Sequence, residues 1–213
     1  CKTDASAKDG FNTNLSGGYS KGFADGDKWL VPEADARITS GWFWGTTKNT
    51  PKTLTELGNM YFQSVGHGAP LLLNVPPNNK GKLDTAIADR VREFGQSIKE
   101  SFKDDLTRAN DKGRAAATAQ ASSTWNDNED YGASKVLDGK DDTYWCAKSA
   151  TDQTLTVKLP KPTTFDIVSI EEAIQNGQRI SGFTVSYQTE ENGAWIEFGR
   201  GGTIGAKRLV RGA

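Results

Sequence analysis

The period of the hydrophobic pattern changes near residue 110, and this change constrains the fold more than any other feature of the chain. Before it, apolar residues recur three or four positions apart, which is the spacing of amphipathic helices. Beyond it, they alternate with polar residues, as in half-buried β-strands. A single layer of one element type cannot satisfy both periods, so the sequence predicts an α/β part followed by an all-β part.

The first part reads as strand and helix units. Helices are predicted over 53–64 and 83–102, where apolar residues return to one face, and short strands over 37–39 and 42–44. Between the helices, Leu71–Val75 is a continuous apolar run that ends at two prolines, as in a parallel strand buried on both faces. This order fits the C-terminal portion of a (β/α)₈ barrel better than a complete fold.

The second part is predicted to be a β-sandwich. Its strand patterns are separated by Pro, Gly and Asn and fall at 154–159, 165–170 and 183–187. The Ala-rich polar stretch before them has no hydrophobic period and reads as a linker. The predicted domains are therefore a barrel part at 1–105, a linker at 106–120 and an incomplete sandwich at 121–213.

Composition excludes several classes of protein. With 26 Lys and Arg against 27 Asp and Glu, the chain has no basic surface for nucleic acid, and no apolar run is long enough to span a membrane. Two cysteines, Cys1 and Cys146, and the single histidine, His67, exclude a disulfide scaffold and multi-histidine metal chemistry. The chain starts without Met and ends in strand-like residues, so we expect a piece truncated at both ends.

Two pairs of side chains suggest chemistry on sugars. Glu33 and Asp35, in PEAD, are two residues apart and would point the same way in an extended segment. Glycosidases need two carboxyl groups at the scissile bond, but a solvated pair of loop acids explains the same pattern. Trp42 and Trp44 would likewise share one face, either as a sugar-stacking platform or as core.

The first part resembles the second half of the catalytic barrel of glycoside hydrolase family 29, the α-L-fucosidases. The resemblance rests on WLVPEADARITSGWFW and SVGHGAPLLLNVPPNNKGKLD, and it covers roughly residues 1 to 102. In the second part, EAIQNGQRI at 172–180 resembles the β-sandwich of the subfamily that acts on α-1,3/4-linked fucose. VLDGKDDTYW is similar to discoidin-like domains and family 32 carbohydrate-binding modules, which are jelly-roll sandwiches.

This resemblance implies a retaining α-L-fucosidase that needs no cofactor and acts on fucosylated oligosaccharides or glycoproteins. Glu33 matches the acid/base glutamate, and the aspartate nucleophile would lie upstream of Cys1, so the chain alone should be inactive. Asp35, Trp42 and Trp44 would line the substrate site, and His67 would be either a pocket residue or an ordinary loop residue. An extracellular, periplasmic or cell-surface location is implied.

The discoidin-like segment implies a structural calcium ion held by Asp138, Asp141 and Thr143. A plain Asp-Gly turn explains the same residues. In the rival interpretation of the whole chain, the sandwich is a non-catalytic carbohydrate-binding or adhesion module that uses its tryptophans. We expect instead that Trp125, Trp145 and Trp195 are buried and that 172–180 braces the barrel.

Overall fold

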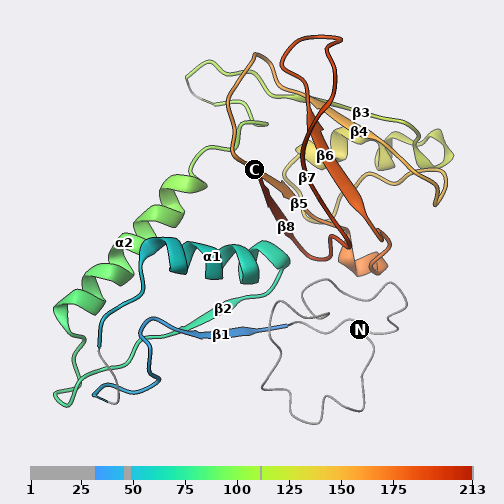
Figure 1. Ribbon diagram of the computed structural model, residues 1–213. Coiled ribbons are helices and arrows are strands. Elements are labelled where there is room, and N and C mark those ends of the chain that lie inside the picture. The colour runs from blue at the N-terminus through green and yellow to red at the C-terminus, as the bar shows by residue number, and fades with distance from the viewer. Residues whose placement is uncertain (1–31, 46–48, 111, 213) are drawn as a thin grey trace. The chain divides into compact units, whose positions relative to one another are not determined.

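The structure, a computed structural model, describes residues 32–45, 49–110 and 112–212 (Figure 1). It contains two compact units, one formed by the residues up to 102 together with 166–213, and the other by 103–165. The chain thus passes between units twice, whereas the sequence predicts one passage. The predicted domain boundaries at 105 and 121 remain a prediction, because compactness is not a test of independent folding.

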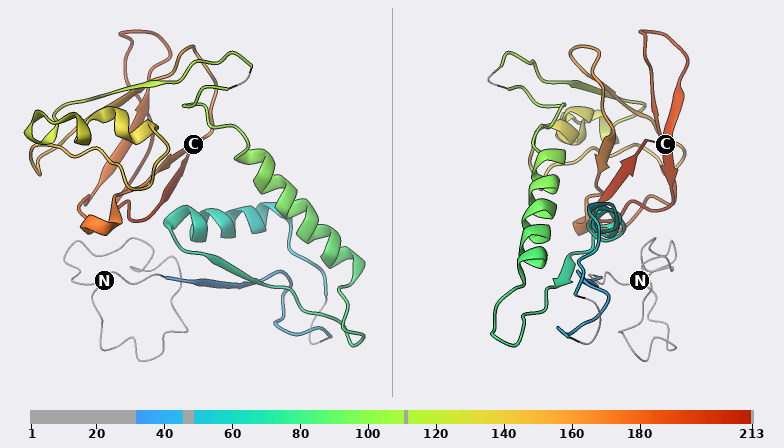
Figure 2. Two further views of the ribbon diagram at one scale, coloured as in Figure 1. Left: turned by 180° about the vertical axis from the view of Figure 1, so that it is seen from behind. Right: turned by 60° about the vertical axis from the view of Figure 1, so that its left-hand side comes forward.

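The first unit begins with a βαβα arrangement. Its elements are β1 (Ala34–Arg37), α1 (Leu54–Ser64), the short 3₁₀ helix η2 (Val65–His67), β2 (Leu71–Asn74) and α2 (Thr85–Ser101). β1 and β2 pair in parallel, from Ala34 opposite Leu71 to Arg37 opposite Asn74. Both predicted helices are confirmed. Figures 1 and 2 show α1 lying along the strand pair with α2 beside it.

A capping box starts α1 at the predicted place. The Thr53 hydroxyl accepts a hydrogen bond from the Glu56 amide at 3.2 Å, and Glu56 accepts one from the Thr53 amide at 2.8 Å. Two amides that would lack helical partners are thereby satisfied. These bonds to Thr53 lower the pKa of the Glu56 carboxyl.

The core of this arrangement joins a strand end to both helices. Ile38, Leu57 and Ile87 are fully buried, and each burial is worth about 1.5–3 kcal/mol. Around them pack Met60, Leu73, Val75, Val91 and Phe94. The apolar stripes that predict the helices are therefore the faces that α1 and α2 turn inward.

The strand predicted over 42–44 is not formed. The aromatic run there forms bends and a turn, because the Thr39 hydroxyl donates to the Gly41 carbonyl at 2.9 Å and Gly45 takes a positive φ of 79°. Trp42 and Trp44 therefore do not share a strand face. The strand predicted over 71–75 is present as β2, with Leu72 54% exposed in this two-stranded sheet. Asp35, its register partner, is exposed too.

The first unit also contains antiparallel strand pairs. β5 (Ile167–Ile170) pairs with β8 (Arg208–Arg211), and β6 (Phe183–Tyr187) pairs with β7 (Ile196–Gly201). The strands predicted over 165–170 and 183–187 are thus confirmed. Within the unit, β8 packs on η2.

The second unit contains one antiparallel pair and three short helices. β3 (Thr118–Ala121) pairs with β4 (Leu155–Lys158), which lies inside the strand predicted over 154–159. Three 3₁₀ helices lie between these strands: η3 (Trp125–Asp127), η4 (Glu129–Tyr131) and η5 (Ala133–Leu137). A further 3₁₀ helix, η6 (Ile174–Asn176), belongs to the first unit. Within the described ranges, no helix has the length and apolar character needed to cross a membrane.

Candidate functional site at the carboxyl edge of β1 and β2

Side chains from both parallel strands meet where these strands end. β1 ends at Arg37 and β2 at its register partner Asn74, so both lie at the same edge. The Arg37 guanidinium carbon is 5.3 Å from the ring centroid of Trp42, a cation–π contact. The Asn74 amide donates to the Trp42 carbonyl at 2.8 Å. Side chains from both strands therefore contact Trp42, yet 42% of the surface of Trp42 remains exposed.

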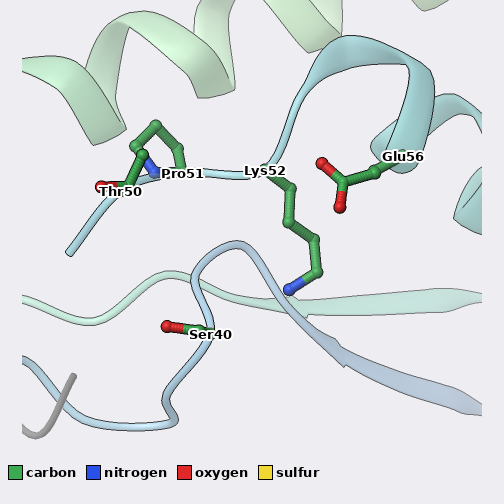
Figure 3. A pocket seen from close by; sticks show the side chains of 5 residues that line it. All are labelled: Ser40, Thr50, Pro51, Lys52 and Glu56. Atoms are coloured by element: carbon green, nitrogen blue, oxygen red, sulfur yellow. The ribbon is translucent and has the colours of Figure 1, made fainter. Parts of the chain in front are cut away.

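A hollow of about 410 Å³ opens beside this edge (Figure 3). It is lined by Ser40, Thr50, Pro51, Lys52 and Glu56. The Lys52 ammonium donates to the Thr39 carbonyl at 2.9 Å, just beyond the end of β1. Burial, and after it the positive charge of Arg37, lowers the pKa of Lys52, while Glu56 opposes the shift. The edge is thus polar and carries two neighbouring cations.

Trp44 has a different partner from Trp42. Its indole N–H donates to Asp84 at 2.7 Å, and the Asn78 amide donates to the other oxygen of the same carboxylate at 2.9 Å. These bonds, the one from Asn78 first, lower the pKa of Asp84. Trp44 therefore ties the turn after β1 to the start of α2.

Glu33 and Asp35 point the same way, and Glu33 lies at the opposite end of β1 from Arg37. Both are exposed and flank the buried Ala34. Glu33 precedes the first residue of β1, so it lies at the amino edge of the strand pair. At about 3.3 Å per residue, roughly 13 Å separates its Cα from that of Arg37. The catalytic role of Glu33 remains a prediction.

His67 also lies away from the carboxyl edge. It ends η2, before β2 begins, and its Nδ1 is 2.9 Å from the Phe62 carbonyl oxygen. Because a carbonyl oxygen only accepts, Nδ1 carries the proton in this contact. The structure shows His67 holding a helix end. Its predicted contribution to a substrate pocket is not tested.

The predicted calcium ligands form a closed turn. The Thr143 hydroxyl is 2.8 Å from each Asp138 carboxylate oxygen, and the Lys140 amide donates to the same carboxylate at 3.0 Å. These bonds lower the pKa of Asp138, and Gly139 takes the positive φ of 75° that the turn requires. Asp141 is exposed. Across the described ranges, no three His, Cys, Asp or Glu side chains gather as metal ligands would. These bonds are those of an Asp-Gly turn, and a calcium role of Asp138, Asp141 and Thr143 stays a prediction.

The expectation of buried sandwich tryptophans is wrong for two of the three. Trp125 is 46% exposed and Trp195 is 57% exposed. Trp145 is half-buried and donates its indole N–H to the Ser123 carbonyl at 2.9 Å.

Sequence reasoning missed Arg37 and Lys52. The available signal is topological: paired parallel strands end at one edge, so the residue that ends each strand and the loop that follows it lie close together. Asn74, which ends β2, hydrogen-bonds the turn that contains Trp42.

Comparisons with known proteins place both units of the structure within similar proteins, and one family match spans the boundary between these units at 165/166. The family model for the F5/8 type C domain, a β-sandwich, matches residues 118–211. The chain is 30% identical over 187 residues to alpha-L-fucosidase 1 of Arabidopsis thaliana, covering 87% of this chain and 36% of that protein.

Solved structures are similar to this chain as well. A Ruminococcus gnavus GH29 fucosidase in complex with fucose is 54% identical, with a TM-score of 0.79, over 89% of this chain and 37% of that one. A structure described as SpGH29 is 36% identical, with a TM-score of 0.76, over 90% of this chain and 40% of that one. The chain thus spans well under half the length of these relatives.

Together, the comparisons point to one class of proteins: the chain is similar to glycoside hydrolases over most of its length, and its residues 118–211 match the F5/8 type C domain. More particularly, this chain is homologous to the α-L-fucosidases of glycoside hydrolase family 29.

Proposed function

We propose that the complete protein carrying this chain is a retaining α-L-fucosidase that releases terminal α-L-fucose from fucosylated oligosaccharides or glycoproteins. The observation that carries the proposal is the 54% identity, over 89% of the chain, to a fucosidase solved with fucose. We extend the proposal to α-1,3/4 linkages on the resemblance of 172–180. Because such glycans are displayed on secreted and surface glycoproteins, we also propose an extracellular, periplasmic or cell-surface location.

The proposal includes a (β/α)₈ barrel whose closing units are residues 32–102. The parallel pairing of β1 and β2 and the helix between them support it. In a barrel, the face of the strands opposite the helices is interior, which accounts for the exposure of Leu72 in a two-stranded sheet. Active sites of barrels lie at the carboxyl edge of the strands, where Arg37, Trp42 and Asn74 meet.

Retaining hydrolysis needs two carboxyl groups about 5–5.5 Å apart, one as nucleophile and one as acid/base. In the proposal the nucleophile is an aspartate upstream of Cys1, and Glu33 is the acid/base. No cofactor is required, because carboxylates and a shaped pocket stabilise the oxocarbenium-like transition state. Trp42 would stack on the sugar. The position of Glu33 at the amino edge makes its role the part of the proposal that most needs a direct test.

An aryl α-L-fucoside tests the activity. The complete protein should hydrolyse it and release fucose first as the α-anomer, which proton NMR resolves before mutarotation. The 213-residue chain alone should show no turnover above background. An inactive complete protein would contradict the proposal, and turnover by the chain alone would contradict an upstream nucleophile.

The exposed tryptophans support a second candidate, a carbohydrate-binding role for the F5/8 type C domain. Trp125 and Trp195 present indole surface of the kind that stacks on sugars. Calorimetry of the chain with fucose and galactose decides: millimolar or tighter binding that Trp125→Ala or Trp195→Ala abolishes would support this role. Absence of heat with both sugars would exclude it for these monosaccharides.

A further inference from the structure

We propose that Arg37 is a positioning residue for sugar binding: it fixes the Trp42 ring from one face and leaves the opposite face for fucose. The inference rests on the proposed function for its ligand. The placement of the ring is a property of the free protein and can be tested separately.

The backbone between the two residues explains how they meet. Arg37 is the last residue of β1, and the chain then bends back, with the Thr39 hydroxyl bonded to the Gly41 carbonyl at 2.9 Å. The bend returns Trp42 to the strand end, where its ring centroid lies 5.3 Å from the guanidinium carbon. A planar guanidinium over an indole face is attracted by the ring quadrupole and restricts the ring to one orientation.

A second contact fixes the backbone that carries the ring. Asn74, at the end of β2, donates to the Trp42 carbonyl at 2.8 Å. The carbonyl is thus held from one strand and the ring from the other. A side chain with both ends held loses little further freedom when a sugar stacks on it, and such preorganisation raises affinity.

The chemistry of the edge favours positioning over direct charge recognition. Fucose is uncharged, so the cation has no counter-charge to meet on the sugar. The nearest acid in the hollow, Glu56, is already bonded to the Thr53 amide and hydroxyl, each at 2.8 Å. The arginine at this edge therefore acts by contacting the π face of Trp42, and 42% of the surface of Trp42 remains exposed.

Fluorine NMR of the complete protein labelled with 5-fluorotryptophan tests the placement. Trp42→Phe assigns the resonance of Trp42. Arg37→Met keeps the length of the side chain and removes the cation, so it should shift and broaden this resonance without ligand. Arg37→Lys, which keeps a cation, should shift it less. Arg92→Met is the matched control, since Arg92 is a highly exposed arginine that pairs with Asp89 on α2, and it should leave the resonance unchanged.

Kinetics on the aryl fucoside tests the functional consequence. Arg37→Met should raise KM about two- to fivefold, the range expected for an exposed cation–π contact, with kcat changed less than twofold. Arg37→Lys should recover most of the loss. A fall in kcat of about two- to fivefold with KM unchanged would overturn the positioning role.

The outcomes separate this inference from the proposed function. An unchanged Trp42 resonance in Arg37→Met overturns the inference whatever the activity. A shifted resonance that does not respond to fucose in the native protein keeps the contact but refutes Trp42 as the sugar platform. If Arg37→Met does not fold, Arg37→Gln gives the same two readouts, and an unchanged resonance in it would refute the inference equally.

Discussion

Glu33 is the single residue on which the predicted mechanism depends most. If it is the acid/base, Glu33→Ala in the complete protein should slow substrates with poor leaving groups by about 10²–10⁴-fold, because only these need a proton at departure. Activated aryl fucosides should lose less and should regain rate with azide, which replaces the base-assisted water. Measurement of kcat/KM on both substrate types, with and without azide, decides.

Asp35→Asn is the matched control for that measurement, since Asp35 is the other exposed acid of the pair. An equal loss on both substrates without azide rescue would remove Glu33 from the mechanism. The test is demanding because Glu33 lies at the amino edge of the strand pair, whereas active sites of barrels lie at the carboxyl edge.

The cap of α1 gives a second test at the scale of single residues. Thr53→Ala removes the hydroxyl that accepts from the Glu56 amide, and it should cost about 1 kcal/mol of unfolding free energy. Thr55→Ala, an exposed threonine in the same helix, should cost nothing measurable. Urea unfolding of both variants makes the comparison, and equal losses would contradict the capping role.

The same cap predicts a pH dependence. The pKa of Glu56 is lower in the folded chain than its unfolded value of about 4.3. Its ionised form therefore stabilises the fold above about pH 4.3, and this contribution is lost as pH falls through the lower folded-state pKa. The stability difference between the native chain and Glu56→Gln should shrink over that acid range. A difference that stays constant below pH 4 would refute the linkage.

At the scale of elements, both helices follow from their apolar stripes, and the start of α1 follows from the capping box of Thr53 and Glu56. The segment 38–45 could not be predicted in the same way. Its aromatic and β-branched residues favour a strand, but the Thr39 hydroxyl and Gly45 give the backbone a turn. Local hydrogen bonds there override strand propensity. The candidate site depends on this turn, so the shared strand face predicted for Trp42 and Trp44 is not formed, and the substrate role of Trp42 stays a prediction.

The inward face of α1 can be tested against its outward face. Leu57 is fully buried among Ile38 and Ile87, and Leu57→Ala should cost about 2–5 kcal/mol. Leu54 lies in the same helix but is 39% exposed, so Leu54→Ala should cost far less. Thermal and urea unfolding measure both variants. Similar losses would show that the core is not centred on Leu57.

Gly68, in the turn after η2, and Gly58, inside α1, make a matched pair of glycines. Gly68 has a φ of 79°, and a Cβ there would lie 3.1 Å from the Lys207 amide nitrogen and 3.2 Å from the Ala206 Cβ. Gly68→Ala should therefore destabilise the chain by about 1 kcal/mol or more. Gly58, inside α1, has open space around its Cβ position, and Gly58→Ala should stabilise by about 0.5–1 kcal/mol. Opposite signs in urea unfolding are the expected result.

At the scale of the whole molecule, the sequence predicts both kinds of structure but not which segments pack together. Periodicity reports the face of an element and carries no information on its distant neighbour. The predicted brace at 172–180 illustrates this limit. Glu172 accepts from the Gly205 amide at 2.6 Å and from the Ile180 amide at 2.9 Å, so it organises a loop inside the β part. The contacts to the helical part are made by the residues after that loop.

These contacts come from β8 and the residue before it. Leu209 lies against Gly66, where a Cβ would be 3.4 Å from the leucine Cβ. The Arg211 guanidinium lies 4.2 Å from the ring centroid of Phe62. A Cβ at Gly68, after η2, would lie 3.1 Å from the Lys207 amide nitrogen. The strands of 166–212 are thus packed as part of the same unit as the two long helices.

The last prediction follows from this packing. A polypeptide of residues 121–213 alone would expose the face of Leu209 that η2 covers, so we expect it to lack a cooperative unfolding transition. In the intact chain, Leu209→Ala should lower the stability reported by α1 and by β8 together, by about 2–4 kcal/mol, since Leu209 is only 9% exposed. Hydrogen exchange at amides of both elements measures the coupling, with Val157→Ala, 39% exposed in the other unit, as control. A cooperative transition of the isolated segment, or loss of protection in β8 alone, would show instead that the β part folds independently.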